Sequence, residues 1–332
     1  MSKPVQVEVI LSLSEYLPVV DVWLIVDILR ASTMMVSWFA AGGGDLYPTA
    51  SVEDARRLAA SLKEEGKEPL LMGEQNAIAP QGFDLGNSPL SITPELVQNA
   101  SCAVMATTNG TKAMLKAAST GTPVLVACAR NAFAVLDAAL SKGYRIGIFC
   151  SGRKGRPSWD DTLCAGLLVA YLTEHFPDTR LADGARLAHL AWRGSKDFKS
   201  SLKTADHAIF LEKVGYGGDV AFAAEIDAVR VVPELHELLA EKENGKENEK
   251  EMRAVLRLAP STEKSFVLDD RPLPSPSGLD TGTTSFGVFA DPERDRTQSP
   301  VSAVWREELG VGEVFFAGET YRKQRKNRAR RT

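Results

Sequence analysis

Polar side chains follow four apolar stretches of the sequence, at the point where each stretch ends. The four polar segments are residues 27–33, 107–111, 128–131 and 150–153, and each precedes a stretch with a helical pattern. Free N–H groups at the start of a helix bind anions. If the apolar stretches are parallel strands, their carboxyl ends share one edge of a sheet, where open α/β folds bind ligands. The sequence therefore predicts an anion site at that edge.

Hydroxyl, amide and glycine residues in these segments are the predicted substrate-binding groups. They are Ser32, Thr33, Thr108, Asn109, Gly110, Thr111, Asn131, Ser151 and Gly152. The alternative for each residue alone is a simple helix cap, which these residue types also favour. Arg30 adds a planar guanidinium that can bind a phosphate through two hydrogen bonds. Its alternative role is a surface ion pair.

Six carboxylates lie at the ends of predicted elements or in loops. They are Asp27, Glu74, Asp84, Asp160, Asp161 and Asp219. Carboxylate oxygens beside an anion pocket suit Mg²⁺ that holds a substrate phosphate. Asp27 follows Leu-Ile-Val of a predicted buried strand, where a carboxylate is costly without a partner. Asp160 and Asp161 have an alternative role as helix N-terminal charges.

From these residues we predict a catalytic set and a metal-binding set. The predicted catalytic residues are Asp27, Arg30 and Asp161, and the predicted metal ligands are Asp27, Glu74, Asp84 and Asp161. The loop at residues 73–89 carries two of the ligands, and a loop of this length with three glycines is typical of a functional loop. Asn87 and Ser88, near its end, complete the predicted substrate-binding set.

A competing pattern is C-x5-R, formed by Cys150 and Arg156 after a predicted strand. Cysteine phosphatases wrap a phosphate around a thiolate with this spacing, so a cysteine-dependent phosphatase is one alternative. Residues 157–159 delay the next helix, which favours a buried structural role for Cys150. Nucleotide-binding glycine motifs are absent from the sequence. None of the four histidines is predicted to be catalytic.

Apolar, β-branched runs alternate with helical patterns through the first 235 residues. Strands are predicted at 5–11, 22–28, 45–48, 69–72, 102–106, 123–127, 145–149 and 228–232. Helices are predicted near 32–41, 52–66, 109–119, 131–142 and 160–175, with several more over 183–227. Parallel strands need helical crossovers that cover both faces of the sheet. The pattern therefore predicts a three-layer α/β/α fold with a mostly parallel or mixed sheet.

The sequence predicts three regions. Residues 1–240 form the α/β domain, 241–320 a linker and irregular extension, and 321–332 a basic, disordered tail. The extension contains weak strand patterns at 265–268, 285–289 and 313–317, and a short helix at 301–309. Seven of the last twelve residues are Lys or Arg, although the chain carries a net charge of −4. The acidic body argues against a specific nucleic-acid partner.

Composition also limits the class of protein. Its 332 residues, 44% hydrophobic and 25% charged, match an ordinary globular protein. We expect no membrane segment and no secretory signal, and therefore a cytoplasmic protein. The four cysteines stand far apart, which argues against structural zinc and disulfides.

Several motifs resemble one family along roughly residues 5–235. They are Val-Asp-Ile-Leu-Arg-Ala-Ser-Thr (26–33), Gly-Glu (73–74), Gly-Phe-Asp-Leu-Gly-Asn-Ser-Pro (82–89), Thr-Thr-Asn-Gly-Thr (107–111), Asn131 and Asp-Asp-Thr-Leu-Cys-Ala-Gly (160–166). In order and spacing they resemble the 2-phosphosulfolactate phosphatase family.

The resemblance implies a Mg²⁺-dependent phosphomonoester hydrolase. Its reaction would convert 2-phospho-3-sulfolactate and water to 3-sulfolactate and phosphate, a step of coenzyme M biosynthesis. The partner would be a small phosphorylated, sulfonated substrate, and a homo-oligomer is compatible with it. The sequence departs from the family pattern at Gln75, where an arginine is usual, and at Asp160, where a glutamate is usual. A non-catalytic anion-binding protein is the remaining alternative.

Overall fold

The computed structural model describes residues 3–75, 77–241 and 250–259. All of these residues lie in one compact unit, which ends at or before residue 279. The elements expected at 265–268, 285–289, 301–309 and 313–317, and the basic tail 321–332, lie outside the described residues.

The described residues form one ten-stranded sheet with helices around it. Its strands are β1 (Gln6–Ile10), β2 (Val22–Val26), β3 (Leu46–Thr49), β4 (Pro69–Gly73), β5 (Cys102–Ala106), β6 (Val124–Ala127), β7 (Arg145–Cys150), β8 (Arg180–Leu181), β9 (Pro233–Glu241) and β10 (Lys250–Leu258). The helices are α1 (Ala31–Ala40), α2 (Val52–Glu64), α3 (Pro94–Gln98), α4 (Gly110–Ala118), α5 (Ala132–Lys142), α6 (Trp159–His175), α7 (Asp183–Arg193), α8 (Phe198–Lys203), α9 (Asp206–Lys213) and α10 (Gly217–Ala223).

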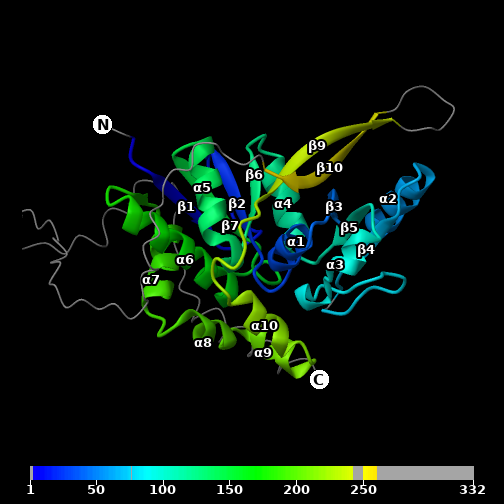
Figure 1. Cartoon of the computed structure of the whole chain (residues 1–332). Coiled ribbons are helices and arrows are strands. Elements are labelled where there is room, and N and C mark those ends of the chain that lie inside the picture. Colours follow the sequence, from blue (N-terminus) through cyan, green and yellow to red (C-terminus); the bar gives the residue numbers. More distant parts are fainter. Residues whose placement is uncertain (1–2, 76, 242–249, 260–332) are drawn as a thin grey trace, which may run out of the picture. The chain divides into compact units, whose positions relative to one another are not determined.

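The central strands are continuous apolar runs because helices cover both of their faces. Every residue of β2 is buried, which is typical of an interior strand of a parallel sheet. Helix α6 packs between α5 and α7, whereas α1 packs on α4. These two groups of helices form the outer layers around the strands (Figure 1). The predicted three-layer α/β fold is confirmed.

The sheet consists of two parallel groups joined by an antiparallel hairpin. Its strand order is β4-β5-β3-β10-β9-β6-β2-β7-β1-β8. The pairs β6–β9, β9–β10 and β10–β3 are all antiparallel. Because three antiparallel pairs lie between β6 and β3, the strands of one parallel group run in the opposite direction to the strands of the other group. Figure 1 shows β3, β4 and β5 on one side of the hairpin and β1, β2, β6 and β7 on the other.

This reversal corrects the prediction that all four polar segments follow strands of one common edge. Val26, the last residue of β2, pairs with Ala127 and Cys150, the last residues of β6 and β7. Three of the segments therefore start level with one another. The fourth segment follows β5, in the other group of strands. It lies near the first three because it leads into α4, which packs against β2.

The hairpin also extends the sheet past residue 240, the domain boundary expected from the sequence. Strand β10 pairs with β9 along its whole length and with β3 at Leu256. The charged residues around 241–251 are typical of a linker, so sequence pattern alone does not predict a strand there. The strand expected at 228–232 is absent, and β9 begins at Pro233 instead. No helix of the described residues is long and apolar enough to cross a membrane.

Candidate active site

Asp27 is a buried carboxylate directly after β2. Among the described residues its carboxylate accepts one hydrogen bond, from the Ala31 N–H at the long distance of 3.4 Å. Burial raises the pKa of Asp27 to about 6, with Asp160 and Glu74 adding to the rise and His207 opposing it. A carboxylate with so few partners in the protein is available to a ligand.

Asp161, in the first turn of α6, joins the ends of β2 and β7. Its Oδ1 accepts the Ile28 N–H at 2.9 Å, and its Oδ2 accepts the Gly152 N–H at 3.0 Å and the Ser151 hydroxyl at 3.2 Å. Burial, Asp160 and Asp27 raise the pKa of Asp161, while the Ile28 N–H opposes this rise. Asp161 therefore fixes the two loops that surround Asp27.

Asp160 faces a histidine that comes from a distant part of the chain. The Asp160 Oδ2 lies 3.4 Å from Nδ1 of His207, in the first turn of α9. His207 is close enough to Asp27 to lower the pKa of that carboxyl group. Sequence analysis missed His207, because only the packing of α6 against α9 brings it to the site.

Glu74 and Gly110 connect the loops after β4 and β5 with Asp27. Glu74 accepts the Thr108 N–H at 2.9 Å and the Ala77 N–H at 2.8 Å. Gly110 lies so close that a Cβ atom on it would stand 2.7 Å from Asp27 Oδ2 and 2.6 Å from the Ala31 Cβ. The segment after β5 therefore touches the segment after β2, as the sequence predicts, although the two strands belong to different groups.

We expect Gly110→Ala to lower kcat by about a hundredfold, because the added methyl group pushes the Asp27 carboxylate from its position and small displacements of reacting groups are costly. A phosphatase assay measures kcat, and thermal unfolding checks the fold. Wild-type kcat in the folded variant would show that Asp27 tolerates the shift.

Arg30 forms a buried ion pair rather than the surface pair considered from the sequence. Its Nη1 donates to Asp219 Oδ2 at 2.8 Å, with both side chains 2% exposed, and its Nη2 donates to the Ala77 carbonyl oxygen at 3.2 Å. The guanidinium carbon lies 4.4 Å from the centre of the Tyr216 ring. Asp219 also accepts the Ser88 hydroxyl at 2.6 Å. Arg30 is thus held by two segments, the loop after β4 and the start of α10, and these two hydrogen bonds leave three of its five N–H groups free for a ligand.

Comparison with known proteins decides the family. A family model described as 2-phosphosulpholactate phosphatase matches residues 11–238. The chain belongs to the 2-phosphosulfolactate phosphatase family. A probable 2-phosphosulfolactate phosphatase of Deinococcus radiodurans is 37% identical over 65% of this chain and 88% of its own length. The proteins of the same name from Thermus thermophilus and Clostridium novyi are 36% and 33% identical, over 67% and 64% of this chain and 90% and 88% of their own lengths.

Membership in this family of phosphoric monoester hydrolases confirms the expected enzyme class. The matched residues include all the predicted site residues and His207. They stop before β10, so the family comparison covers neither that strand nor the residues beyond it.

Several residues predicted to bind substrate make local hydrogen bonds in this family member. Ser32 Oγ accepts the Asp27 N–H at 3.2 Å, and Thr33 Oγ1 donates to the Ile28 carbonyl oxygen at 2.8 Å. Thr111 Oγ1 donates to Thr107 O at 3.2 Å. Asn131 accepts the Cys128 N–H at 2.9 Å and donates to Val126 O at 3.1 Å. These side chains shape the loops around Asp27.

Other predicted residues keep groups that a substrate can contact. Asn87 is buried, and its Oδ1 has no hydrogen-bond partner among the residues that the structure describes. The N–H groups of Asn109 and Gly110, at the start of α4, likewise have no hydrogen-bond acceptor within the described part of the chain. Unpaired buried polar groups are rare in proteins, so the Asn87 Oδ1 favours a polar ligand. The N–H groups at the start of a helix are free in any helix and can bind an anion.

Asp84, a predicted metal ligand, lies apart from the strand ends. Its exposed carboxylate accepts the Leu71 N–H at 2.8 Å, in the middle of edge strand β4. No group of three or more His, Cys, Asp or Glu side chains within the described residues is arranged to hold a metal ion.

The alternative C-x5-R site does not match the geometry of a cysteine phosphatase. Cys150 is fully buried, and burial raises the pKa of its thiol well above the ordinary value. Its Sγ donates to the Asp161 carbonyl oxygen at 3.5 Å, and Arg156 lies in an exposed turn. A neutral, enclosed thiol is a poor nucleophile.

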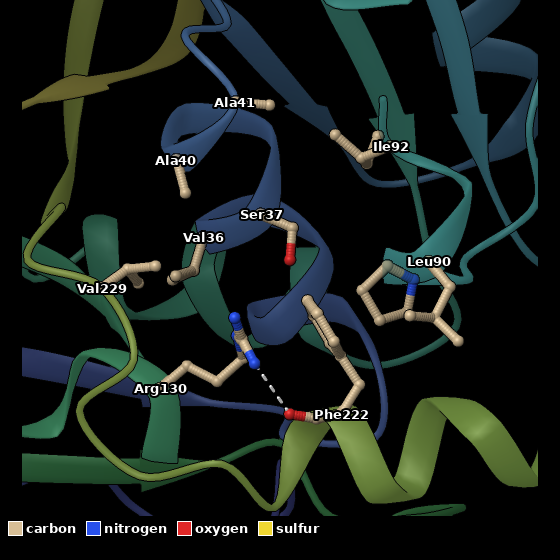
Figure 2. A pocket seen from close by; sticks show the side chains of 10 residues that line it. Val36, Ser37, Ala40, Ala41, Leu90, Ile92, Arg130, Phe222 and Val229 are labelled. Atoms are coloured by element: carbon tan, nitrogen blue, oxygen red, sulfur yellow. Dashed lines mark hydrogen bonds between the residues drawn. The ribbon is translucent and has the colours of Figure 1, made fainter. Parts of the chain in front are cut away.

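A cavity of about 250 Å³ lies along the second half of α1, away from Asp27, which precedes that helix. It is mostly apolar, and Figure 2 shows Ser37 and Arg130 among its lining residues. Arg130 stacks on the Phe222 ring at 3.6 Å and donates to the Phe222 carbonyl oxygen at 3.0 Å. The polar groups of Arg130 therefore hold α10 against the residues after β6.

Proposed function

We propose that this chain hydrolyses phosphate monoesters and that 2-phospho-3-sulfolactate is its substrate, with 3-sulfolactate and phosphate as products. The observation that carries the proposal is Asp27, a buried carboxylate with one long hydrogen bond at the end of β2. The names of the relatives support the substrate. Coenzyme M biosynthesis and a cytoplasmic location stay predictions.

We include Mg²⁺ as the cofactor, because the residues at the site fit a hard cation. Burial and neighbouring carboxylates raise the pKa values of Asp27 and Asp161, and no Lys or Arg of the described residues pairs with either. A bound cation would offset this repulsion. Mg²⁺ often uses only one or two carboxylates together with substrate phosphate oxygens, so a preformed cage is not needed. Asp27 would hold it, with Asp161 and Glu74 beside it; Asp84 lies apart.

When bound, Mg²⁺ supplies charge that polarises the phosphoryl oxygens. Asp27 would either attack phosphorus or position a water molecule for that attack. The free N–H groups of Asn109 and Gly110 can donate to the phosphoryl group, and Arg30 adds positive charge that the loop after β4 and the start of α10 hold in place. Ser151 and Gly152 act through Asp161, which accepts both of their hydrogen bonds.

The proposal is tested by phosphate release from 2-phosphosulfolactate and from p-nitrophenyl phosphate. We expect EDTA to abolish turnover, added Mg²⁺ to restore it, and Cys150→Ser to retain most of it, because a serine hydroxyl can donate to the same Asp161 carbonyl oxygen. Loss of turnover in folded Cys150→Ser with no effect of EDTA would instead support a cysteine-dependent phosphatase. Absence of turnover on both esters would support a non-catalytic binding protein.

A further inference from the structure

Asp160 and His207 form a carboxylate–imidazole pair beside Asp27. Asp160 is 3% exposed and His207 is 22% exposed, so the pair lies at the border between the buried carboxylates and solvent. The imidazole faces the carboxylate through Nδ1, at 3.4 Å from Oδ2. A histidine placed in this way can exchange protons with water and still contact a bound ligand.

The carboxylate determines which ring nitrogen is free. A carboxylate that faces Nδ1 favours a proton on that atom and leaves Nε2 for proton transfer, as in other acid–base pairs of this kind. Nε2 of His207 has no hydrogen-bond partner among the described residues. The Asp160 carboxylate therefore orients the ring through Nδ1, and Nε2 on the opposite side of the ring is available to a ligand.

The leaving group of the proposed reaction needs a proton donor. The alcohol oxygen of an alkyl phosphate leaves as a strongly basic alkoxide unless it is protonated as its bond to phosphorus breaks. General acids contribute about 10²- to 10⁴-fold to such steps. The carboxylates Asp27, Asp160 and Asp161 serve other roles, and Arg30 does not release protons at ordinary pH.

We propose that His207 donates this proton through Nε2 and that Asp160 is its positioning residue; the inference rests on the proposed phosphatase function. As the ester P–O bond breaks, its electron pair moves to the alcohol oxygen, which takes the proton from imidazolium and leaves as the alcohol. The attacking water gives up one proton when it forms phosphate, and that proton returns to the neutral imidazole. The reaction is balanced with water as the only co-reactant.

The test compares two esters whose leaving groups differ. 2-Phosphosulfolactate releases an alkoxide that needs a proton, whereas p-nitrophenolate is a stable anion that needs none. We expect His207→Asn to lower kcat/KM on 2-phosphosulfolactate by about a hundredfold or more and on p-nitrophenyl phosphate by less than about tenfold. Asp160→Asn should show the same selectivity for the alkyl ester with a smaller loss. His189→Asn is the matched control and should change neither rate, because this half-buried histidine of α7 makes no hydrogen bond or ion pair with a site residue in the described part of the chain.

Equal losses on the two esters, or no loss on either, would overturn the role of His207. If the wild-type enzyme hydrolyses neither ester, the proposed function itself fails. Where His207→Asn does not fold, His207→Gln is the second variant.

The wild-type enzyme provides a further test. Its rates on substituted phenyl phosphates should depend only weakly on the acidity of the leaving group, because a proton donor reduces the charge on the leaving oxygen. A steep dependence would contradict a proton donor.

Discussion

Asp27→Asn is expected to lower kcat by at least about a thousandfold, because the amide keeps the shape of the side chain but removes the charge that binds a cation or attacks phosphorus. Asp27 has no substitute at the end of β2, since both oxygens of Asp161 and of Glu74 already accept hydrogen bonds from the protein. Phosphate release under saturating substrate measures the effect. Near-normal turnover in the folded variant would remove Asp27 from the mechanism.

The same substitution should stabilise the metal-free protein at neutral pH. Burial raises the Asp27 pKa from its ordinary 3.8 to about 6, so the folded state binds the proton more tightly than the unfolded state. The wild-type protein is therefore most stable below pH 4 with respect to this group and loses stability as the pH rises through about 6, by up to about 3 kcal/mol. With EDTA present, Asp27→Asn should raise the melting temperature at pH 7 and have little effect at pH 4.

Asp84→Asn is the comparison for Asp27→Asn. Sequence analysis predicts both residues as metal ligands, but the Asp84 carboxylate binds the Leu71 N–H in the middle of β4. We expect this variant to keep most of its activity.

Local patterns predict the elements around the site correctly. The apolar runs of β2, β5, β6 and β7 are each followed by polar residues, and burial of Asp27 follows from its place after Leu-Ile-Val. Such patterns depend on residues close in the sequence, so one chain is enough to recognise them.

Features that depend on distant pairings cannot be predicted in this way. The reversal of the sheet requires β10 to pair with β3, and the partner of Asp160 lies on α9.

Residue type also does not distinguish a serine that binds a ligand from a serine that binds the backbone. Ser32 lies in the first turn of α1 and Asn109 is the N-cap residue of α4, but only Ser32 uses its side chain to bind the backbone at the end of a strand.

The Arg30–Asp219 pair supports a second prediction of large effect, on stability. Asp219→Ala should destabilise the fold by about 3–5 kcal/mol, because it leaves the Arg30 guanidinium buried without its carboxylate. It also removes the acceptor of the Ser88 hydroxyl. Denaturant unfolding measures the change. Asp183→Ala is the matched control, since its ion pair with Arg186 is exposed and should contribute less than about 1 kcal/mol.

Removing both partners separates the structural role of Arg30 from its catalytic role. In Arg30→Met with Asp219→Leu, no buried charge is left unpaired, and such replacements are often neutral or stabilising. We expect this double variant to recover most of the stability that Asp219→Ala loses. We also expect it to be inactive, because the positive charge that Arg30 supplies to the phosphoryl group is gone. If the double variant is both stable and active, Arg30 serves only to hold α10 and the loop of Ser88 against the start of α1.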